Sequence, residues 1–142
     1  MTVLLACAAA TWFMVGLHWF VQVVHYPLFA QVGEERFTAF HAEHSSRTTL
    51  VVLPPMAVEL ATSLWLVVAP VAGTSRALAG VGLALAVLTW LSTGLLQVPR
   101  HAELGAGFDP VVHGRLVRSS WVRTAAWTAH GAVVAVLLAQ AV

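Results

Sequence analysis

The sequence predicts an all-α integral membrane protein, an antiparallel four-helix bundle that forms a single domain over residues 1–142. Hydrophobic residues make up 59% of the chain and charged residues only 9%, whereas about 25% of residues are charged in a soluble domain. Four apolar segments, residues 3–32, 37–69, 77–104 and 111–142, each exceed the roughly 20 residues that cross a bilayer core. The connections between them are short, which favours antiparallel neighbours.

A single turn separates the first two segments. The first segment has no basic stretch before it and is longer than the apolar region of a signal peptide, so we expect it to remain as a permanent span. Gly33 ends this segment. Glu34 and Glu35 follow, and acidic side chains suit the positive N-terminal end of the second helix.

Proline, glycine and aspartate mark the later boundaries. Pro70 and Gly73 close the second segment, and Gly105 ends the third. Asp109 has the properties of an N-cap, and Pro110 those of a first helical residue. Helices of about 30 residues reach about 45 Å, which exceeds the ~30 Å hydrocarbon core. We expect the surplus to project as a polar cap at the first and third connections.

Positive charge predicts the orientation. All seven basic residues are arginines, and only Arg76 lies near the second connection. The other six lie in or near the first and third connections: Arg36, Arg47, Arg100, Arg115, Arg118 and Arg123. Because cytoplasmic loops are enriched in basic residues, we expect these connections on the cytoplasmic side of a bacterial inner membrane, with both termini outside. No basic face indicates a nucleic-acid partner.

The two halves of the chain resemble one another. A shift of 72 residues aligns Pro27 with Pro99 and Gly33 with Gly105. The pattern predicts two repeated helical hairpins related by an axis along the membrane normal. Each proline would also kink its helix and free a carbonyl one turn earlier.

Five of the seven histidines are expected at one depth. They are six to eleven residues from the turns at Gly33 and Gly107, which places them within a slab of roughly 8 Å. Imidazoles in hydrocarbon are costly unless paired or bound, so they are functional candidates. These five are His25, His41, His44, His101 and His113.

The histidine layer predicts a transition-metal site. Neutral imidazole binds zinc, copper and iron, and a chain with one cysteine lacks the thiolates of an iron–sulfur cluster. We expect all five histidines to hold one or two ions in an oxidoreductase. Its substrate would be a small hydrophobic or lipid-like molecule that enters from the bilayer. Gln97 and Arg123 are the predicted catalytic residues, which would orient substrate or oxygen.

Other interpretations of these residues stay open. The layer could bind haem or chlorophyll in a subunit of a larger membrane complex. His18, Glu59 and His130 could extend a polar path in a small metal or proton carrier, or the last two could form a buried pair. The histidines nearest the turns could be solvated at the cytoplasmic surface. The expected partners are membrane lipids and the substrate, with a homo-oligomer or a larger membrane complex left open.

A further motif runs from the third segment into the fourth. It comprises Gln97-Val98-Pro99-Arg100-His101, Leu104, Asp109, Leu116 and Trp121-Val122-Arg123-Thr124. Over this stretch, less than a third of the chain, the sequence resembles the anthrone oxygenase-like family of small four-helix membrane proteins. His101 stands where asparagine is usual in that family, and Trp121 and Arg123 are closer together. The resemblance implies a four-helix fold and oxidation of an aromatic or lipid-like substrate, without naming a metal.

Overall fold

The computed structural model describes all 142 residues, which form helices and no strand. The first long segment joins α1 (Thr2–Phe20), the π-helix η1 (Val21–His25), α2 (Tyr26–Leu28) and the 3₁₀-helix η2 (Phe29–Gln31). The second is α3 (Glu34–Val68). The third joins α4 (Arg76–Ser92), the π-helix η3 (Thr93–Gln97) and α5 (Val98–Leu104), and the fourth is α6 (Pro110–Gln140). Four long apolar helices are thus confirmed, each end lying within three residues of its predicted position.

Local side chains account for the starts of two helices. The Asp109 carboxylate accepts hydrogen bonds of 2.7 and 3.0 Å from the backbone N–H groups of Val111 and Val112, and Pro110 is the first residue of α6. The N-cap predicted at Asp109 is therefore confirmed. Ser75 caps α4 in the same way, by accepting from the N–H of Leu78.

The two π-helices stand directly before the two prolines of the repeat. Pro27 and Pro99 each follow, by two residues, the last residue of a π-helix. A proline cannot donate to the carbonyl four residues earlier and clashes with it, and one wide turn relieves that conflict. η1 and η3 start at Val21 and Thr93, 72 residues apart, so the backbone irregularity follows the repeat seen in the sequence.

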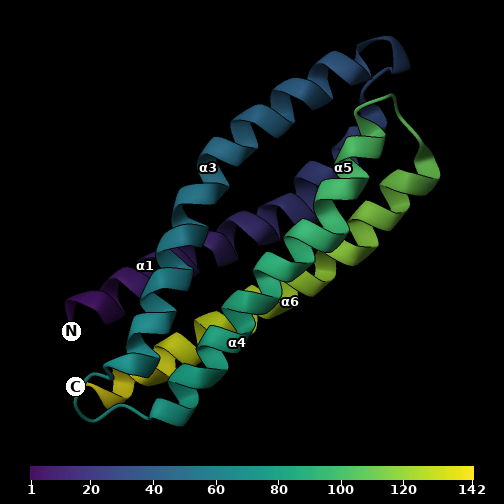
Figure 1. The fold of residues 1–142 in the computed structure, drawn as a ribbon. Helices are drawn as coiled ribbons and strands as arrows, with labels where there is room; N and C mark the ends of the chain where they lie inside the picture. The colour runs from purple at the N-terminus through teal and green to yellow at the C-terminus, as the bar shows by residue number, and fades with distance from the viewer.

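The four segments lie side by side. α1 contacts α3 and α6, and α4 contacts the same two helices. Both termini and the α3–α4 connection lie at one end of the molecule, and the other two connections lie at the opposite end (Figure 1). α3 remains helical through Pro54 and Pro55 but changes direction along its length, and prolines inside a helix are a usual cause of such a bend.

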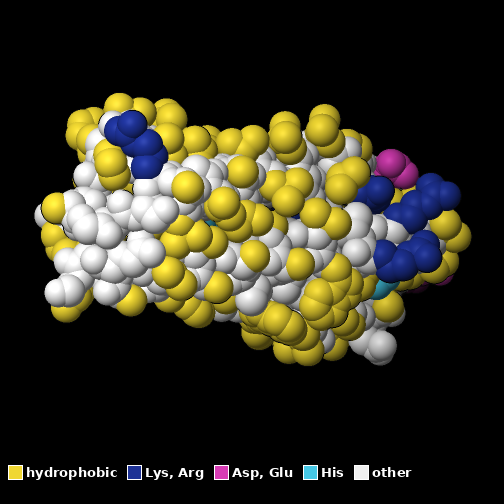
Figure 2. All heavy atoms as spheres, turned by 90° about the horizontal axis from the view of Figure 1, so that it is seen from below, with side chains coloured by type: hydrophobic (Ala, Val, Ile, Leu, Met, Phe, Trp, Pro, Cys, Tyr) yellow, Lys and Arg dark blue, Asp and Glu magenta, His cyan; other side chains and the backbone are white.

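Hydrophobic side chains cover the sides of the molecule, and charged side chains gather at its two ends (Figure 2). Among the most exposed are Leu50 at 74% and Leu95 at 71%. A soluble monomer rarely exposes so much continuous apolar surface. All four segments are long and apolar enough to cross a membrane.

Candidate functional site

Four of the five predicted metal-ligating histidines meet in the structure. The Nε2 atom of His25, at the end of η1, is 2.9 Å from Nδ1 of His44 on α3. The Nε2 atom of His41, one turn earlier on α3, is 3.0 Å from Nδ1 of His101 on α5. The ring centres of His44 and His101 are 5.7 Å apart, which brings the two pairs together. We call these four residues the histidine cluster.

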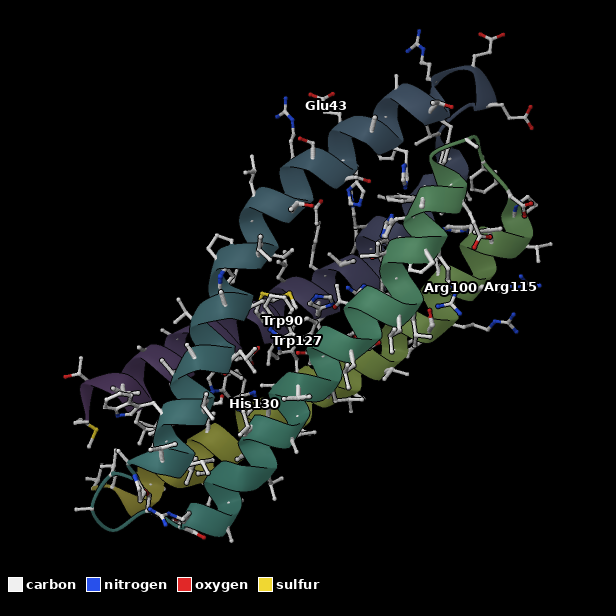
Figure 3. The ribbon with its side chains drawn as sticks, in the orientation of Figure 1. Glu43, Trp90, Arg100, Arg115, Trp127 and His130 are labelled. Carbon is white, nitrogen blue, oxygen red and sulfur yellow. The ribbon has the colours of Figure 1, made fainter.

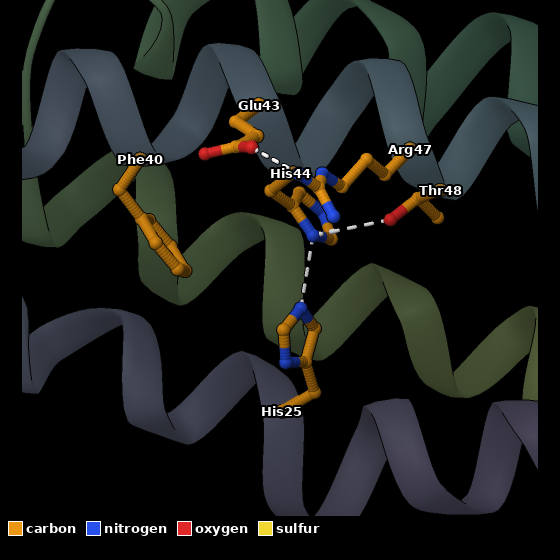
Figure 4. A pocket seen from close by; sticks show the side chains of 6 residues that line it. All are labelled: His25, Phe40, Glu43, His44, Arg47 and Thr48. Atoms are coloured by element: carbon orange, nitrogen blue, oxygen red, sulfur yellow. Dashed lines mark hydrogen bonds and ion pairs between the residues drawn. The ribbon is translucent and has the colours of Figure 1, made fainter.

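One pair of the cluster faces a surface groove of about 520 Å³. Figure 4 shows His25 and His44 in this groove, with the Thr48 hydroxyl 3.1 Å from Nδ1 of His44. Glu43 and Arg47 form an exposed ion pair beside them. Such an exposed pair contributes little to stability, so its place at the groove is its more informative property.

The other pair is held by a buried hydrogen-bond chain. Arg123 on α6 donates from Nη2 to the hydroxyl of Tyr26 at 3.1 Å, and this hydroxyl is 3.1 Å from Nε2 of His101. A guanidinium only donates, so the Tyr26 hydroxyl is left to donate to His101. His101 then carries its proton on Nδ1 and donates to Nε2 of His41. The chain fixes the tautomer of His101 from a residue two helices away.

On its inner side the cluster borders a cavity of about 280 Å³, which we call the Arg123 cavity. Its walls include His44, His101, Tyr26 and Arg123. The cavity lies between α3 on one side and η3 and α5 on the other, with α1 and α6 behind it. His44 lines both the groove and the cavity, so the cluster separates the molecular surface from the interior.

Both predicted catalytic residues line this cavity. Gln97 is 1% exposed and donates from Nε2 to the Ser119 hydroxyl at 3.0 Å, while its Oε1 atom is buried without a partner. The Nε atom of Arg123 is also buried without a partner. Buried polar atoms are rarely left unpaired in proteins, so each such atom calls for an explanation. Here the two atoms belong to residues of one cavity.

The structure does not bring His113 to the other four histidines. Its Nε2 atom is 2.8 Å from the backbone carbonyl oxygen of Tyr26, and its ring stacks on Phe29 with a centroid distance of 6.1 Å. Pro27 and the tightened turn after it leave that carbonyl near the helix end, where a side-chain donor satisfies it. In this arrangement His113 supports the backbone beneath the cluster.

The donor atoms of the cluster fit a transition metal, although only in twos. No three His, Cys, Asp or Glu side chains are grouped so as to hold one metal ion. Two nitrogens bound to one ion at about 2.0–2.1 Å and at a right angle lie about 2.9 Å apart. The separations of 2.9 and 3.0 Å suit both a hydrogen bond and such neighbouring ligands. Each pair therefore offers two of the ligands that zinc, copper or iron requires.

A second buried polar cluster lies deeper, between α3 and α6. The Glu59 carboxylate accepts from Nε1 of Trp127 at 2.8 Å and is paired with Nδ1 of His130 at 2.8 Å. Figure 3 shows Trp127 and His130 inside the molecule, with Glu43 and Arg115 pointing away from it. The pair proposed from depth alone is therefore formed. His18, whose role the sequence left open, stacks on Trp127 with a centroid distance of 4.0 Å and also lines the Arg123 cavity.

Tyr26 is the functional residue that sequence reasoning missed. A tyrosine beside a histidine in an apolar helix is not an unusual residue, and a regular helix would turn the two away from each other. The π-helix adds a residue to the turn before Tyr26 and shifts the facing of everything after it. The proline two residues beyond His25 was the available signal for this irregularity.

Comparisons with known protein families, with curated proteins and with solved structures give no match. The resemblance to the anthrone oxygenase-like family stays a prediction.

Proposed function

We propose that the chain is an integral membrane protein whose four segments insert as an antiparallel bundle. The exposed apolar sides and the charged ends support this arrangement. α3 has 35 residues, so it is about 52 Å long and extends beyond a ~30 Å hydrocarbon layer. The arginine excess favours the first and third connections on the cytoplasmic side of a bacterial inner membrane.

We propose further that the histidine cluster binds iron, copper or zinc, and that the protein is a metal-dependent oxidoreductase for a small hydrophobic substrate. The observation that carries this proposal is the meeting of two imidazole pairs from three helical segments beside a buried cavity. A bound ion would polarise the substrate or exchange electrons with it.

The residues of the chain have separate roles in this function. Tyr26 and Arg123 orient His101 and fix its tautomer, as the partners of metal-ligating histidines commonly do. Gln97 offers an unpartnered carbonyl oxygen to a polar group of the substrate. Lipid surrounds the cavity wall between α3 and α5, so a hydrophobic substrate reaches the site without crossing water.

Metal analysis of protein purified without chelator tests the proposal. We expect at least one equivalent of iron, copper or zinc, and less than half of it in His41→Asn and in His101→Asn. His113→Asn is the matched control, because the structure places His113 on a backbone carbonyl. All variants are first checked for monodispersity.

Less than one equivalent of any of these metals in the unaltered protein would overturn the metal site. Equal metal content in the unaltered protein and in both cluster variants would overturn the assignment of the ligands. Loss of metal in His113→Asn would show that His113 is a ligand, as the sequence predicts.

A further inference from the structure

Arg123 is a buried cation without an acidic partner. Its side chain is 7% exposed, and its hydrogen bonds to protein run from Nη2 to two neutral hydroxyls, those of Tyr26 and Ser120. Its Nε atom is buried with no partner. A guanidinium remains charged in proteins, and an unpaired charge is costly to bury.

No carboxylate of the chain can balance this charge. The ion pairs of the structure are Arg47 with Glu43 and His130 with Glu59. The Arg123 cavity is lined by no aspartate and no glutamate. The negative charge that complements Arg123 therefore comes from outside the chain.

The depth of the cavity indicates what kind of molecule carries that charge. Arg123 lies 13 residues into α6, about 20 Å from the end of a helix that is about 46 Å long. If the surplus length projects at that end, Arg123 lies a few ångströms inside the hydrocarbon layer. Beside the cavity wall of α3 and η3, Leu50 and Leu95 are 74% and 71% exposed. A ligand that enters here passes through lipid.

The walls of the cavity suit a molecule with two chemically different ends. Thr48, Thr93 and Gln97 place polar atoms near Arg123, while Val52 and Val98 line the sides that face α3 and α5. A volume of about 280 Å³ is at the lower end for ligand pockets. It accommodates a head group and the first carbons of a tail, with the rest of the tail between the helices or in lipid.

We propose that the Arg123 cavity binds the carboxylate of a single-tailed amphipathic molecule, such as a fatty acid of medium length. Arg123 holds the carboxylate, and the tail leaves between α3 and the η3–α5 segment. This inference rests on the proposed function only in naming the substrate class for the same site. Binding of the carboxylate itself requires no metal.

Equilibrium dialysis of the full chain in nanodiscs tests the proposal, with radiolabelled decanoate and decanol as probes and empty nanodiscs as background. We expect one decanoate per chain and at least 10-fold weaker binding of decanol. Arg123→Gln should weaken decanoate binding about 10- to 100-fold, the range of a lost charge-assisted hydrogen bond. Arg118→Gln removes the same charge from an exposed position of the same helix and should leave binding unchanged.

Equal binding of decanoate and decanol would overturn the proposal, as would full decanoate binding by folded Arg123→Gln. Competition by acetate at the same concentration as decanoate would show a site for any small anion and would overturn the tail. Arg123→Lys keeps the charge, so it decides the matter where Arg123→Gln does not fold, and it should bind decanoate more tightly than decanol. His41→Asn should retain decanoate binding even if it loses metal, which separates this test from that of the metal site.

Discussion

The buried pair of Glu59 and His130 gives a quantitative test of how α3 and α6 are held together. Replacing each residue by leucine removes one partner of the pair, and replacing both removes the pair as a whole. Glu59→Leu leaves the N–H of Trp127 and Nδ1 of His130 without an acceptor. His130→Leu leaves one carboxylate oxygen of Glu59 without its partner.

The free energies of unfolding should not add. An unsatisfied buried polar group costs about 1–3 kcal/mol, so each single variant should lose about 2–4 kcal/mol. The double variant leaves only Trp127 unpaired and should lose about 1–3 kcal/mol. Interhelical hydrogen bonds measured inside membranes average about 0.6 kcal/mol and reach about 1.7 kcal/mol. Because this carboxylate accepts two bonds at 0% exposure, we expect a coupling energy of at least about 1.5 kcal/mol.

The assay is reversible unfolding in mixed micelles, titrated with a denaturing detergent and followed by tryptophan fluorescence. Ser63→Ala is the control, because its hydroxyl lies 3.5 Å from Nε2 of His130, at the limit of a hydrogen bond, and its loss should change little. Additive losses within 0.5 kcal/mol, the usual tolerance for independent sites, would refute the buried pair.

Three further outcomes follow from the structure. Gly82→Ala should destabilise by about 1 kcal/mol relative to Gly80→Ala in the same unfolding assay: a Cβ at position 82 lies 3.1 Å from Nε2 of His130, whereas one at position 80 meets nothing within 4 Å, and the gain in helix propensity is common to both. Equal effects would contradict the packing. Tyr26→Phe should weaken metal binding about 10- to 100-fold in a metal titration without loss of folded protein, because it disconnects His101 from Arg123; unchanged affinity would remove Tyr26 from the site. Bound metal should be lost as the pH falls from about 8 to 5 and should return on reversal, because imidazole must be neutral to ligate. Metal content that is constant over this range would argue against histidine ligands.

Much of the fold follows from local sequence. The lengths of the apolar runs predict four helices, and Asp109 with Pro110 predicts where the last one begins. Depth also follows from counting residues from a turn, because the rise of a helix is constant. Counting of this kind brought Glu59 and His130 to one level before any contact between them was known.

The facing of side chains follows less well from sequence, since one irregular turn changes it. The π-helix before Pro27 brings His25 toward His44 and the neighbouring Tyr26 toward His101. A period of 3.6 residues cannot place both in the interior. His113 shows the converse, because its depth is the one predicted while its side chain is taken up by a backbone carbonyl.

The sequence by itself determined that this chain is four long apolar helices with their polar atoms concentrated near one pair of connections, because hydrogen bonds within a helix and the spacing of apolar residues are local properties. Only the tertiary structure decided that the imidazoles meet in twos and that Arg123 faces a cavity with no acid near it. Contacts of that kind depend on the rotation of each helix about its axis, which packing between helices sets.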